Sequence, residues 1–437
     1  MKNYSRRKFI KSASIGALGF QVVPSRVFGA NDRVALAGIG AGGKGSSDIA
    51  GAHAAGADVV GLCDVDKSRL NQAVKKYPGS KGFTDYRKLF DELGKSIDAV
   101  TVSTPDHMHF HAALRAVQMG KHTYVQKPLT HSIWEARQLA LEAKKNKVIT
   151  QMGNQAHAGE PIRRAVELIR SGVIGKVKEV HAWTNRPIWP QGLKDKLPAQ
   201  EIPKNMNWDQ WIGPAPMRAY NPGYAPFKWR GWWDFGTGAL GDMGCHIMDM
   251  PFWALDLKYP SAVEAKQNGN SLECGPNKSI VTYTFPAGKY SHKMPYVWYD
   301  GGYMPEKSVF EGTIVNSQNA KKFDLILIGE KGKFLFNRNS TKWKTTPEGL
   351  LDDFNPDKSI PRVKNEDQEW IDAIRGVGSE PLSGFAYSGP FTETVLLGNL
   401  AVRLGKRIDW DGINLKATNA PEAAELIKRP YRKGWEV

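Results

Sequence analysis

A glycine-rich turn between an apolar run and a helical pattern constrains the fold of this chain more than any other feature. The apolar run covers residues 34–39, the turn carries Gly40, Gly42 and Gly45, and the helical pattern covers residues 46–55. The glycines fit G-x-G-x-x-G, in which missing side chains permit a tight turn and a close approach of the backbone to a pyrophosphate. An anion there would lie at the N-terminus of the helix. The order predicts a dinucleotide-binding turn at the start of a parallel sheet.

The glycine pattern can be read in two registers. Gly38, Gly40 and Gly43 fit it equally well. We prefer the register that ends at Gly45, because it leaves residues 34–39 as one uninterrupted strand.

A carboxylate follows the next predicted strand. Residues 58–63 form a second apolar run, and Asp64 comes nineteen residues after the last glycine of the turn. This spacing is close to that of the carboxylate that binds a ribose 2′-hydroxyl. Because a carboxylate repels a 2′-phosphate, the sequence favours NAD over NADP. Lys67 and Arg69 would attract that phosphate, but a solvated helix face is the simpler role for both.

A lysine follows a later strand of the same predicted sheet. Residues 99–103 and 123–126 are predicted to be neighbouring parallel strands, and Lys127 comes directly after the second. Ligands of open parallel sheets bind beyond the carboxyl ends of the strands, so Lys127 is placed to reach a substrate. Pro128 cannot continue a strand ladder, and it holds the lysine on a stiff turn.

Several separated motifs give the chain a resemblance to the Gfo/Idh/MocA (glucose-fructose oxidoreductase / inositol dehydrogenase) family. The resemblance runs from about Arg33 to Arg407. In addition to the glycine turn, the motifs are Cys63-Asp64-Val65-Asp66, Thr104-Pro105-Asp106-His107, Gly120-Lys121-His122, Gln126-Lys127-Pro128 and Gly241-Asp242-Met243-Gly244-Cys245-His246-Ile247-Met248-Asp249. The resemblance implies NAD as the cofactor. The residues it implies beside the cofactor, in addition to the glycines and Asp64, are Thr104, Pro105, His107 and Lys127.

The resemblance also implies that Lys127, Asp242 and His246 are catalytic. Moving a hydride from a carbinol to nicotinamide requires a group that takes the hydroxyl proton. An imidazole titrates near neutral pH, so His246 is the expected base, and the Lys127 cation can stabilise the developing alkoxide. Asp242 lies four residues before His246, which places both on one helix face. It can orient the substrate or the imidazole, and it can also cap the helix after Gly241.

One motif departs from the family pattern. The family usually has Glu-Lys-Pro where this chain has Gln126-Lys127-Pro128. The change removes a negative charge beside the lysine and leaves an amide that can hydrogen-bond. The change therefore affects the electrostatic environment of Lys127, while the lysine itself is retained.

The length of 437 residues accommodates two domains. Residues 31–150 alternate strand and helix patterns and predict an α/β Rossmann domain with a doubly wound parallel sheet. Residues 151–437 predict a substrate-binding α/β domain with a largely antiparallel open sheet and closing helices near the C-terminus. Its expected strands include residues 177–184, 279–285, 322–328 and 332–336, and its expected closing helices are residues 365–374 and 391–404.

The second domain is rich in tryptophan. Eight of the 14 Trp residues fall between Trp183 and Trp253. Indole faces match the apolar faces of sugar rings, although core packing is the expected role of at least half of them. Residues 181–189 alternate polar side chains with Trp at strand spacing, which lines one face of a sheet. The predicted substrate-binding residues are Trp183, Asn185, Arg186, Trp189, His157 and Arg230, and Gln155 and Tyr224 are further polar candidates.

Residues 1–30 are typical of a twin-arginine export signal. Arg6 and Arg7 precede a modest apolar run over residues 15–23, and small residues close the segment. The run is too short for a stable membrane anchor. We therefore expect a periplasmic protein.

Charge and cysteine content exclude several other functions. Residues 1–30 carry six basic residues and no acid, so the formal charge falls from +16 to +10 without them. The remaining lysines are scattered and form no stripe, which argues against nucleic-acid binding. The three cysteines lack the spacing of a disulfide framework or a zinc site, so no metal is expected.

The expected function is an NAD-dependent oxidoreductase that acts on a secondary hydroxyl of a carbohydrate or glycoside. The alternative is an NAD-dependent glycosidase, which oxidises a ring hydroxyl, commonly at carbon 3, eliminates the aglycone, adds water and returns the hydride. Both use Lys127 and His246, and an exported location favours a cofactor that regenerates itself. A non-catalytic sugar-binding protein is the third hypothesis, and the intact catalytic residues argue against it. The family further implies a homo-oligomer.

Overall fold

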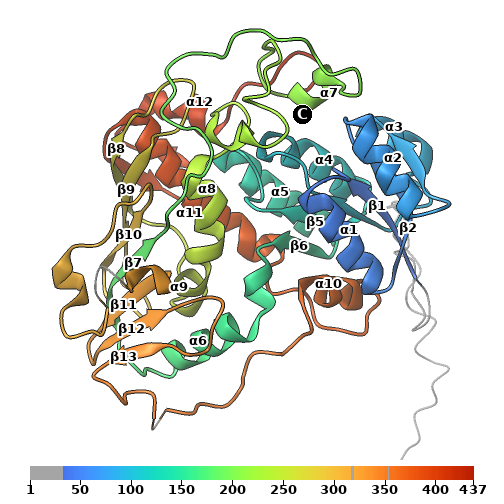
Figure 1. The fold of residues 1–437 in the computed structure, drawn as a ribbon. Coiled ribbons are helices and arrows are strands. Elements are labelled where there is room, and N and C mark those ends of the chain that lie inside the picture. Colours follow the sequence, from blue (N-terminus) through green and yellow to red (C-terminus); the bar gives the residue numbers. More distant parts are fainter. Residues whose placement is uncertain (1–32, 316–318, 353) are drawn as a thin grey trace, which may run out of the picture.

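The computed structural model describes residues 33–437 except 316–318 and 353. Figure 1 shows two sheets, one at each side of the molecule, with helices between them. The expected export signal, residues 1–30, lies outside the described residues. Within the described part of the chain, no helix is long and apolar enough to cross a membrane.

The N-terminal sheet has six parallel strands in the order β3-β2-β1-β4-β5-β6. Its order reverses direction between β1 and β4, and ligands of open α/β sheets bind at such a point. The strands are β1 (Val34–Ile39), β2 (Ala57–Cys63), β3 (Lys81–Phe83), β4 (Ala99–Val102), β5 (His122–Gln126) and β6 (Thr150–Gly153). The predicted doubly wound Rossmann sheet is therefore confirmed.

Helices cover both faces of this sheet. Ile49 and Leu70 pack in one apolar cluster on one face, and Leu89, Leu114 and Leu139 belong to a different cluster. These helices are α1 (Lys44–Ala54), α2 (Lys67–Lys76), α3 (Tyr86–Leu93), α4 (Asp106–Gln118) and α5 (Ile133–Asn146). Because both faces of the sheet are covered, all four residues of β4 are buried, including Thr101.

The second sheet has nine strands in the order β13-β12-β11-β7-β10-β9-β8-β14-β15. Only the pairing of β7 with β10 is parallel among the described pairs, so the predicted, largely antiparallel sheet is confirmed. The strands are β7 (Val177–Trp183), β8 (Ala262–Asn268), β9 (Lys278–Phe285), β10 (Met294–Tyr299), β11 (Leu325–Gly329), β12 (Lys333–Phe336), β13 (Lys344–Thr346), β14 (Ile408–Asp411) and β15 (Lys416–Ala417).

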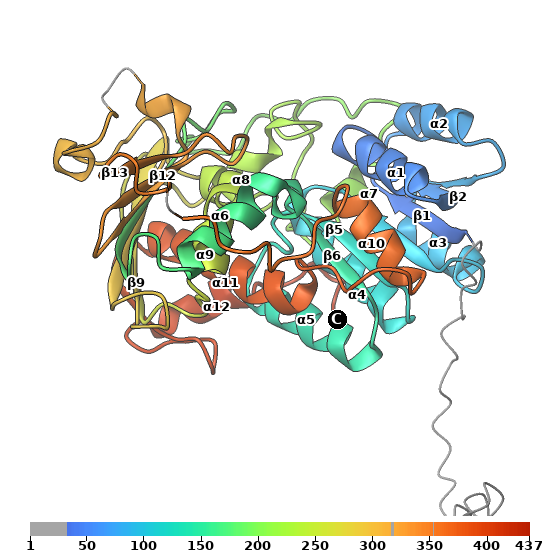
Figure 2. The same cartoon turned by 90° about the horizontal axis from the view of Figure 1, so that it is seen from below.

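Helices between the two sheets join the domains (Figures 1 and 2). They are α6 (Glu160–Arg170), α8 (Gly238–Ile247), α9 (Asp249–Ala254) and α11 (Phe385–Leu404). The inner face of β9 buries alternate residues, and its Tyr283 donates a hydrogen bond to the carbonyl oxygen of Val395 in α11. Helix α11 also packs against α5 of the first domain, so the predicted closing helix holds both domains together.

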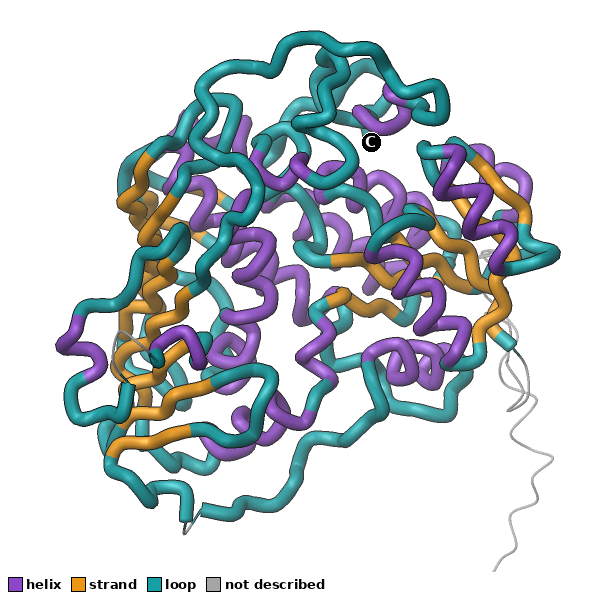
Figure 3. The backbone as a smooth tube through the Cα atoms, in the orientation of Figure 1, coloured by secondary structure: helices purple, strands orange, loops and turns teal. Residues whose placement is uncertain are grey.

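Two further segments return to the first domain. Helix α10 (Glu366–Ile374) packs Trp370 against Tyr124 of β5, and the chain after α12 (Ala424–Ile427) runs along α4. A long loop, residues 184–237, connects β7 to α8 and carries α7 (Trp208–Ile212); we call it the cover loop. Figure 3 shows it as the long teal tube that crosses from the second sheet to the first domain.

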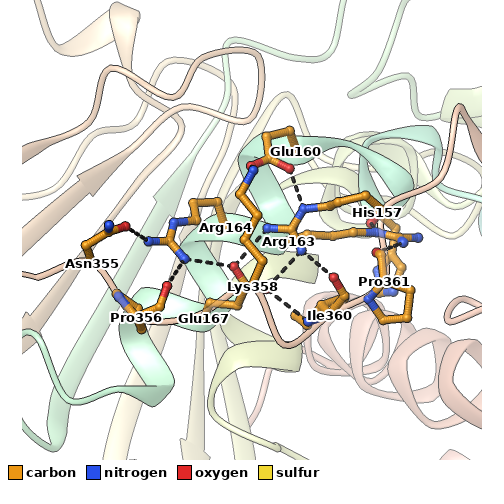
Figure 4. Close-up of polar contacts among 11 residues, drawn as sticks. His157, Glu160, Arg163, Arg164, Glu167, Asn355, Pro356, Lys358, Ile360 and Pro361 are labelled. Atoms are coloured by element: carbon orange, nitrogen blue, oxygen red, sulfur yellow. Dashed lines mark hydrogen bonds and ion pairs between the residues drawn. The ribbon is translucent and has the colours of Figure 1, made fainter.

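Buried ion pairs fix the chain before α10 to α6. Glu167 accepts hydrogen bonds from Arg362 (2.8 and 2.9 Å), Arg164 (3.1 Å) and the amide of Ile360 (2.9 Å), as Figure 4 shows around Glu167. Burial alone would raise the pKa of Glu167, but these donors outweigh it and lower the pKa to about 2. The network keeps residues 355–362 against the helix, and that segment leads directly into α10.

The low pKa of Glu167 makes this network sensitive to acid. A carboxylate whose folded-state pKa is depressed stabilises the fold above its ordinary pKa and loses that effect as pH falls toward the folded value. We expect Glu167→Gln to lower the free energy of unfolding at pH 7 by about 3 kcal/mol. The difference from the unsubstituted protein should shrink below pH 4.5, measured by urea unfolding at pH 7 and 3.5.

The matched control is Glu92→Gln, which removes an exposed pair with Lys81. It should change stability by less than about 1 kcal/mol at either pH. An equal, pH-independent loss in both variants would contradict the role given to Glu167.

Candidate active site

A cavity of about 560 Å³ lies where the carboxyl ends of β1, β2, β4 and β5 meet the cover loop. The first domain contributes the glycine turn, Asp64, Thr104 and Lys127 to its walls. The other walls come from α8 and from the cover loop, through residues that include Met206, Trp211, Phe227, Trp229, Arg230, Asp242 and His246.

The glycine turn has a shape that side chains would disrupt. Gly40 has φ of 85°, and a Cβ atom there would press on the carbonyl of Ser103. A Cβ atom at Gly45 would collide with the carbonyl oxygen of Gly40 as α1 begins. The strand ends at Ile39, as the preferred register predicts, and Gly38 also needs to be small because it packs on Ile49. Both registers therefore describe positions that require glycine.

Asp64 holds the turn in place. Its Oδ2 accepts hydrogen bonds from the amides of Ala41 and Gly42, both 3.0 Å away, and its Oδ1 accepts one from the amide of Asp66 at 2.9 Å. Burial raises the pKa of Asp64, and these donors oppose that effect. A carboxylate has about four acceptor positions, so Asp64 retains capacity for a ribose hydroxyl.

The cavity fits a dinucleotide. Thr104 lines it, and the buried hydroxyl of Thr104 has no hydrogen-bond partner among the described residues. Pro105 precedes the first turn of α4, and Gly42 and Gly43 precede the first turn of α1. Backbone amides at a helix start bind phosphate oxygens. The residues that would hold the cofactor are thus Gly40, Gly42, Asp64, Thr104 and Pro105.

An ion pair joins the two domains at the other end of the cavity. Lys127 Nζ donates to Asp242 Oδ1 and to the backbone carbonyl of Asp242, both at 2.7 Å. Burial would raise the pKa of Asp242, but Lys127 and then Arg230 lower it below the ordinary value. His246 lies one helical turn further along α8 and also lines the cavity. The structure therefore brings together the three predicted catalytic side chains.

His246 differs from expectation in its protonation. Burial, and next the Lys127 cation, lower its pKa to about 3, so the imidazole is neutral at physiological pH. The expected titration near neutral pH is a property of a solvated imidazole and does not apply beside this lysine.

His107 is not part of the cavity wall. It is fully buried, and its two ring nitrogens lie 3.2 Å from the carbonyl oxygen of Phe235 and 2.9 Å from that of Trp211. The expected cofactor contact is therefore corrected: His107 anchors the cover loop to α4. Burial lowers its pKa to about 3, although the two carbonyl oxygens oppose that effect.

The predicted substrate residues separate into two groups. Arg230 lines the cavity, Arg186 lies 4.0 Å from Asp242, and Trp189 packs beneath Arg230. Trp183 faces the opposite side of the sheet, where it packs with Phe310 and donates to the carbonyl of Ala320. Among the predicted residues, Gln155 and Arg230 line the cavity wall. The residues outside the wall are Trp183, Asn185, Arg186, Trp189, His157 and Tyr224, of which Arg186 and Trp189 adjoin the wall residues Asp242 and Arg230.

His157 has a structural partner. It lies between α6 and α9, where Nδ1 is 2.9 Å from Asp249 Oδ2 and the ring stacks on Trp253. Tyr387 donates to the same carboxylate at 2.7 Å. The expected substrate contact of His157 is thus corrected to a buried link between helices.

Sequence reasoning missed a buried carboxylate next to Gln126. Asp48 accepts hydrogen bonds from Ser103 Oγ at 2.7 Å and from Gln126 Nε2 at 3.0 Å, and pairs with Lys44. A buried negative charge therefore lies next to Gln126, although the glutamate usual in the family is absent. Its only sequence signal was the spacing of Lys44 and Asp48 on one helix face.

Sequence reasoning also missed the hydrogen bonds between the cover loop and the first domain. The amide of Lys67 donates to the carbonyl of Asn205 at 2.8 Å, and the amide of Asn207 donates to that of Val65 at 2.9 Å. At α7, Arg432 from the C-terminal segment donates to the carbonyl of Gly213 at 2.9 Å. The loop is therefore fastened beside Asp64 and again near the C-terminus.

A Rossmann domain joined to a largely antiparallel α/β domain, with a lysine, an aspartate and a histidine between them, defines a nucleotide-dependent oxidoreductase architecture. The model of the oxidoreductase family's NAD-binding Rossmann fold matches residues 33–154, and that of its C-terminal alpha/beta domain matches residues 158–289. The chain belongs to the Gfo/Idh/MocA oxidoreductase family, and its cofactor is NAD.

Relatives match parts of the chain. An uncharacterized oxidoreductase of Streptococcus pneumoniae is 31% identical over 132 residues, 30% of this chain and 34% of the relative. A glycosyl hydrolase family 109 protein of Shewanella pealeana is 24% identical over 40% of this chain and 44% of its own length. Levoglucosan dehydrogenase of Pseudarthrobacter phenanthrenivorans is 22% identical over 43% of this chain and 40% of its own length. The chain spans less than half the length of each of these relatives.

A solved structure shares the fold over more of the chain. The WlbA dehydrogenase from Bordetella pertussis, in complex with NADH and UDP-GlcNAcA, has a TM-score of 0.61 and 16% identity. The match covers 87% of this chain and 99% of that chain.

We expect Asp64→Ala to weaken NAD binding about ten- to hundredfold, because a charge-assisted hydrogen bond contributes roughly 1.5–3 kcal/mol. Calorimetry on cofactor-stripped protein measures the effect. Asp58→Ala, which removes an exposed pair with Arg33 at the other end of β2, is the control and should bind NAD normally. Unchanged affinity in the Asp64 variant would exclude this residue from the cofactor site.

Proposed function

We propose that the protein is an NAD-dependent enzyme that transfers a hydride from a secondary hydroxyl of a carbohydrate or glycoside. The observation that carries the proposal is the ion pair of Lys127 with Asp242 beside His246, in the cavity that also contains the glycine turn. The levoglucosan dehydrogenase relative supports a sugar substrate. Bound nicotinamide would supply the hydride acceptor.

Each catalytic side chain has a role that follows from its contacts. An ammonium group has three N–H bonds, and Lys127 directs two of them at Asp242, so one remains for the substrate oxygen. Neutral His246 can accept the hydroxyl proton, and Lys127 stabilises the negative charge that develops on the oxygen. Asp242 holds the ammonium group in place.

A glycosidase that works through transient oxidation is the second candidate. The family 109 glycosyl hydrolase relatives support it, and so does the cover loop, which lies over the cofactor end of the cavity. In this reaction the same residues would form a ketone, and the hydride would return after elimination and water addition. The intact catalytic trio argues against a binding protein without catalysis.

The proposal extends to the cellular setting. Arg6 and Arg7 before an apolar run support twin-arginine export and a periplasmic location. A homo-oligomer is proposed from the family resemblance alone.

The fate of the hydride distinguishes the two enzymes. The protein would be incubated with NAD and aryl glycosides in deuterated water, with absorbance at the NADH band and mass spectrometry of the sugar as measurements. A net oxidoreductase gives a ketosugar and one NADH per turnover, which is the outcome we expect. A glycosidase releases the aglycone without NADH and introduces deuterium at carbon 2, and this result would establish the second candidate.

The low pKa of His246 predicts an unusual pH profile. His246→Gln should lower kcat about a hundred- to ten-thousandfold, the usual contribution of an acid–base group. The ratio of the two rates should stay constant from pH 5 to 9, because the imidazole remains unprotonated far below pH 5.

His292→Gln removes an exposed histidine and is the control, with an expected rate near that of the unsubstituted protein. An acid limb near pH 6.5 that is present only with His246 would show that this residue titrates there and would refute the predicted profile.

A further inference from the structure

Two arginines surround a carboxylate that a lysine already neutralises. Arg230 Nε lies 3.5 Å from Asp242 Oδ1, and Arg186 Nε lies 4.0 Å from Asp242 Oδ2. Lys127 is closer, at 2.7 Å, and by itself balances the carboxylate. We propose that the substrate is an anionic carbohydrate whose oxyanion group is received by Arg186 and Arg230. This inference rests on the proposed function, because it names the substrate class of the same site.

Aromatic contacts orient the Arg230 side chain, and most of its N–H donors have no acceptor among the described residues. Its guanidinium carbon lies 4.3 Å from the ring centre of Trp229 and 4.8 Å from that of Phe227. Its main chain is packed closely against Gly236, where a side chain would collide with it. The side chain donates only one hydrogen bond to a described residue, to the carbonyl of Phe227 at 3.2 Å. A guanidinium has five N–H donors, so most of its edge is free to bind a ligand.

Arg186 has even fewer partners. Its guanidinium donates no hydrogen bond to any residue in the described ranges, and its Nε is 4.0 Å from Asp242 Oδ2, too far for a hydrogen bond. It is about one-third exposed, at 32%. A guanidinium that is partly withdrawn from water and lacks an acceptor is suited to a planar oxyanion, which it can bind through two parallel hydrogen bonds.

The other charged group facing this end of the cavity does not cancel the surplus. Asp106 is buried in the first turn of α4, where it accepts a hydrogen bond from Thr237 at 2.6 Å and faces the positive end of the helix. Counting Asp106 and Asp242 against Lys127, Arg186 and Arg230 leaves one positive charge. A neutral sugar would leave that charge without a protein or ligand partner.

The surplus charge does not belong to the cofactor phosphates. The glycine turn binds a pyrophosphate through backbone amides at the start of α1, and Lys44 and Arg69, each beside a carboxylate, line the cavity at that end. Arg230 and Arg186 instead adjoin the proton-transfer residues. The carboxylate of a uronic acid and the sulfate of a sugar ester share the required chemistry, and both would lie a short distance from the hydroxyl that reacts.

Binding to the NAD-loaded full-length protein tests the proposal without turnover. The probes are methyl glucuronide and methyl galacturonide, the corresponding neutral methyl hexosides, and glucose 6-sulfate, each titrated by calorimetry. We expect an anionic member to bind at least about tenfold more tightly than its neutral counterpart, as one charge-assisted hydrogen bond allows. Arg186→Gln and Arg230→Gln should weaken binding of the anionic sugar at least about tenfold more than binding of its neutral counterpart, and so abolish this preference.

Two further variants keep the result interpretable. Arg230→Lys retains the charge and tests whether the flat guanidinium is needed, and Arg407→Gln removes an exposed arginine far from the site as the control. Thermal melting shows that each variant is folded. If uronates bind selectively, the oxyanion is a carboxylate; if only the sulfate ester does, the oxyanion is a sulfate, and both support the proposal.

Three results would overturn the proposal of an anion site. They are equal affinity for charged and neutral sugars, an equal loss of affinity for both kinds of sugar in the arginine variants, and no binding by any probe. A protein that selects anionic sugars but transfers no hydride would refute the proposed function and leave the anion site standing.

Discussion

The hydrogen-bonded ion pair between Lys127 and Asp242 is the interaction on which the site depends. It joins the end of β5 in the first domain to α8 in the second, and both side chains are mostly withdrawn from water. Breaking a buried pair leaves an uncompensated charge, which costs more than the pair itself contributes. The relative position of the two domains and the direction of the lysine are therefore set together. Arg186 and Arg230 lie around the same carboxylate, and His246 lies one helical turn after it.

The local chemistry of the first domain was predictable from the sequence because it is read from neighbouring residues. A strand, a glycine turn, a helix and Asp64 follow one another within about thirty residues, and each imposes its own backbone geometry. Lys127, Asp242 and His246 were found through motifs, and the structure brings them together. Residues 279–285, which were expected to form a strand, lie in β9.

Long-range choices were not predictable in the same way. Trp183 has the strand spacing of a site residue, but a strand has two faces and only the tertiary fold decides which face meets the cavity. His107 and His157 are titratable residues, yet both contact distant partners, Phe235 and Asp249, outside the cavity wall. The pKa of His246 is lowered by burial in the assembled fold and next by Lys127, which is more than a hundred residues away in the sequence. No single segment contains that information.

The cover loop changes how such an enzyme can use its cofactor. It is bonded to Val65 and Lys67 beside the ribose end of the cavity, and the C-terminal segment secures it at Gly213. Moving the loop away from this end would break those backbone hydrogen bonds, so the loop would slow the exchange of NADH for NAD. In a dehydrogenase that releases NADH, cofactor exchange would then compete with hydride transfer as the step that sets the turnover rate.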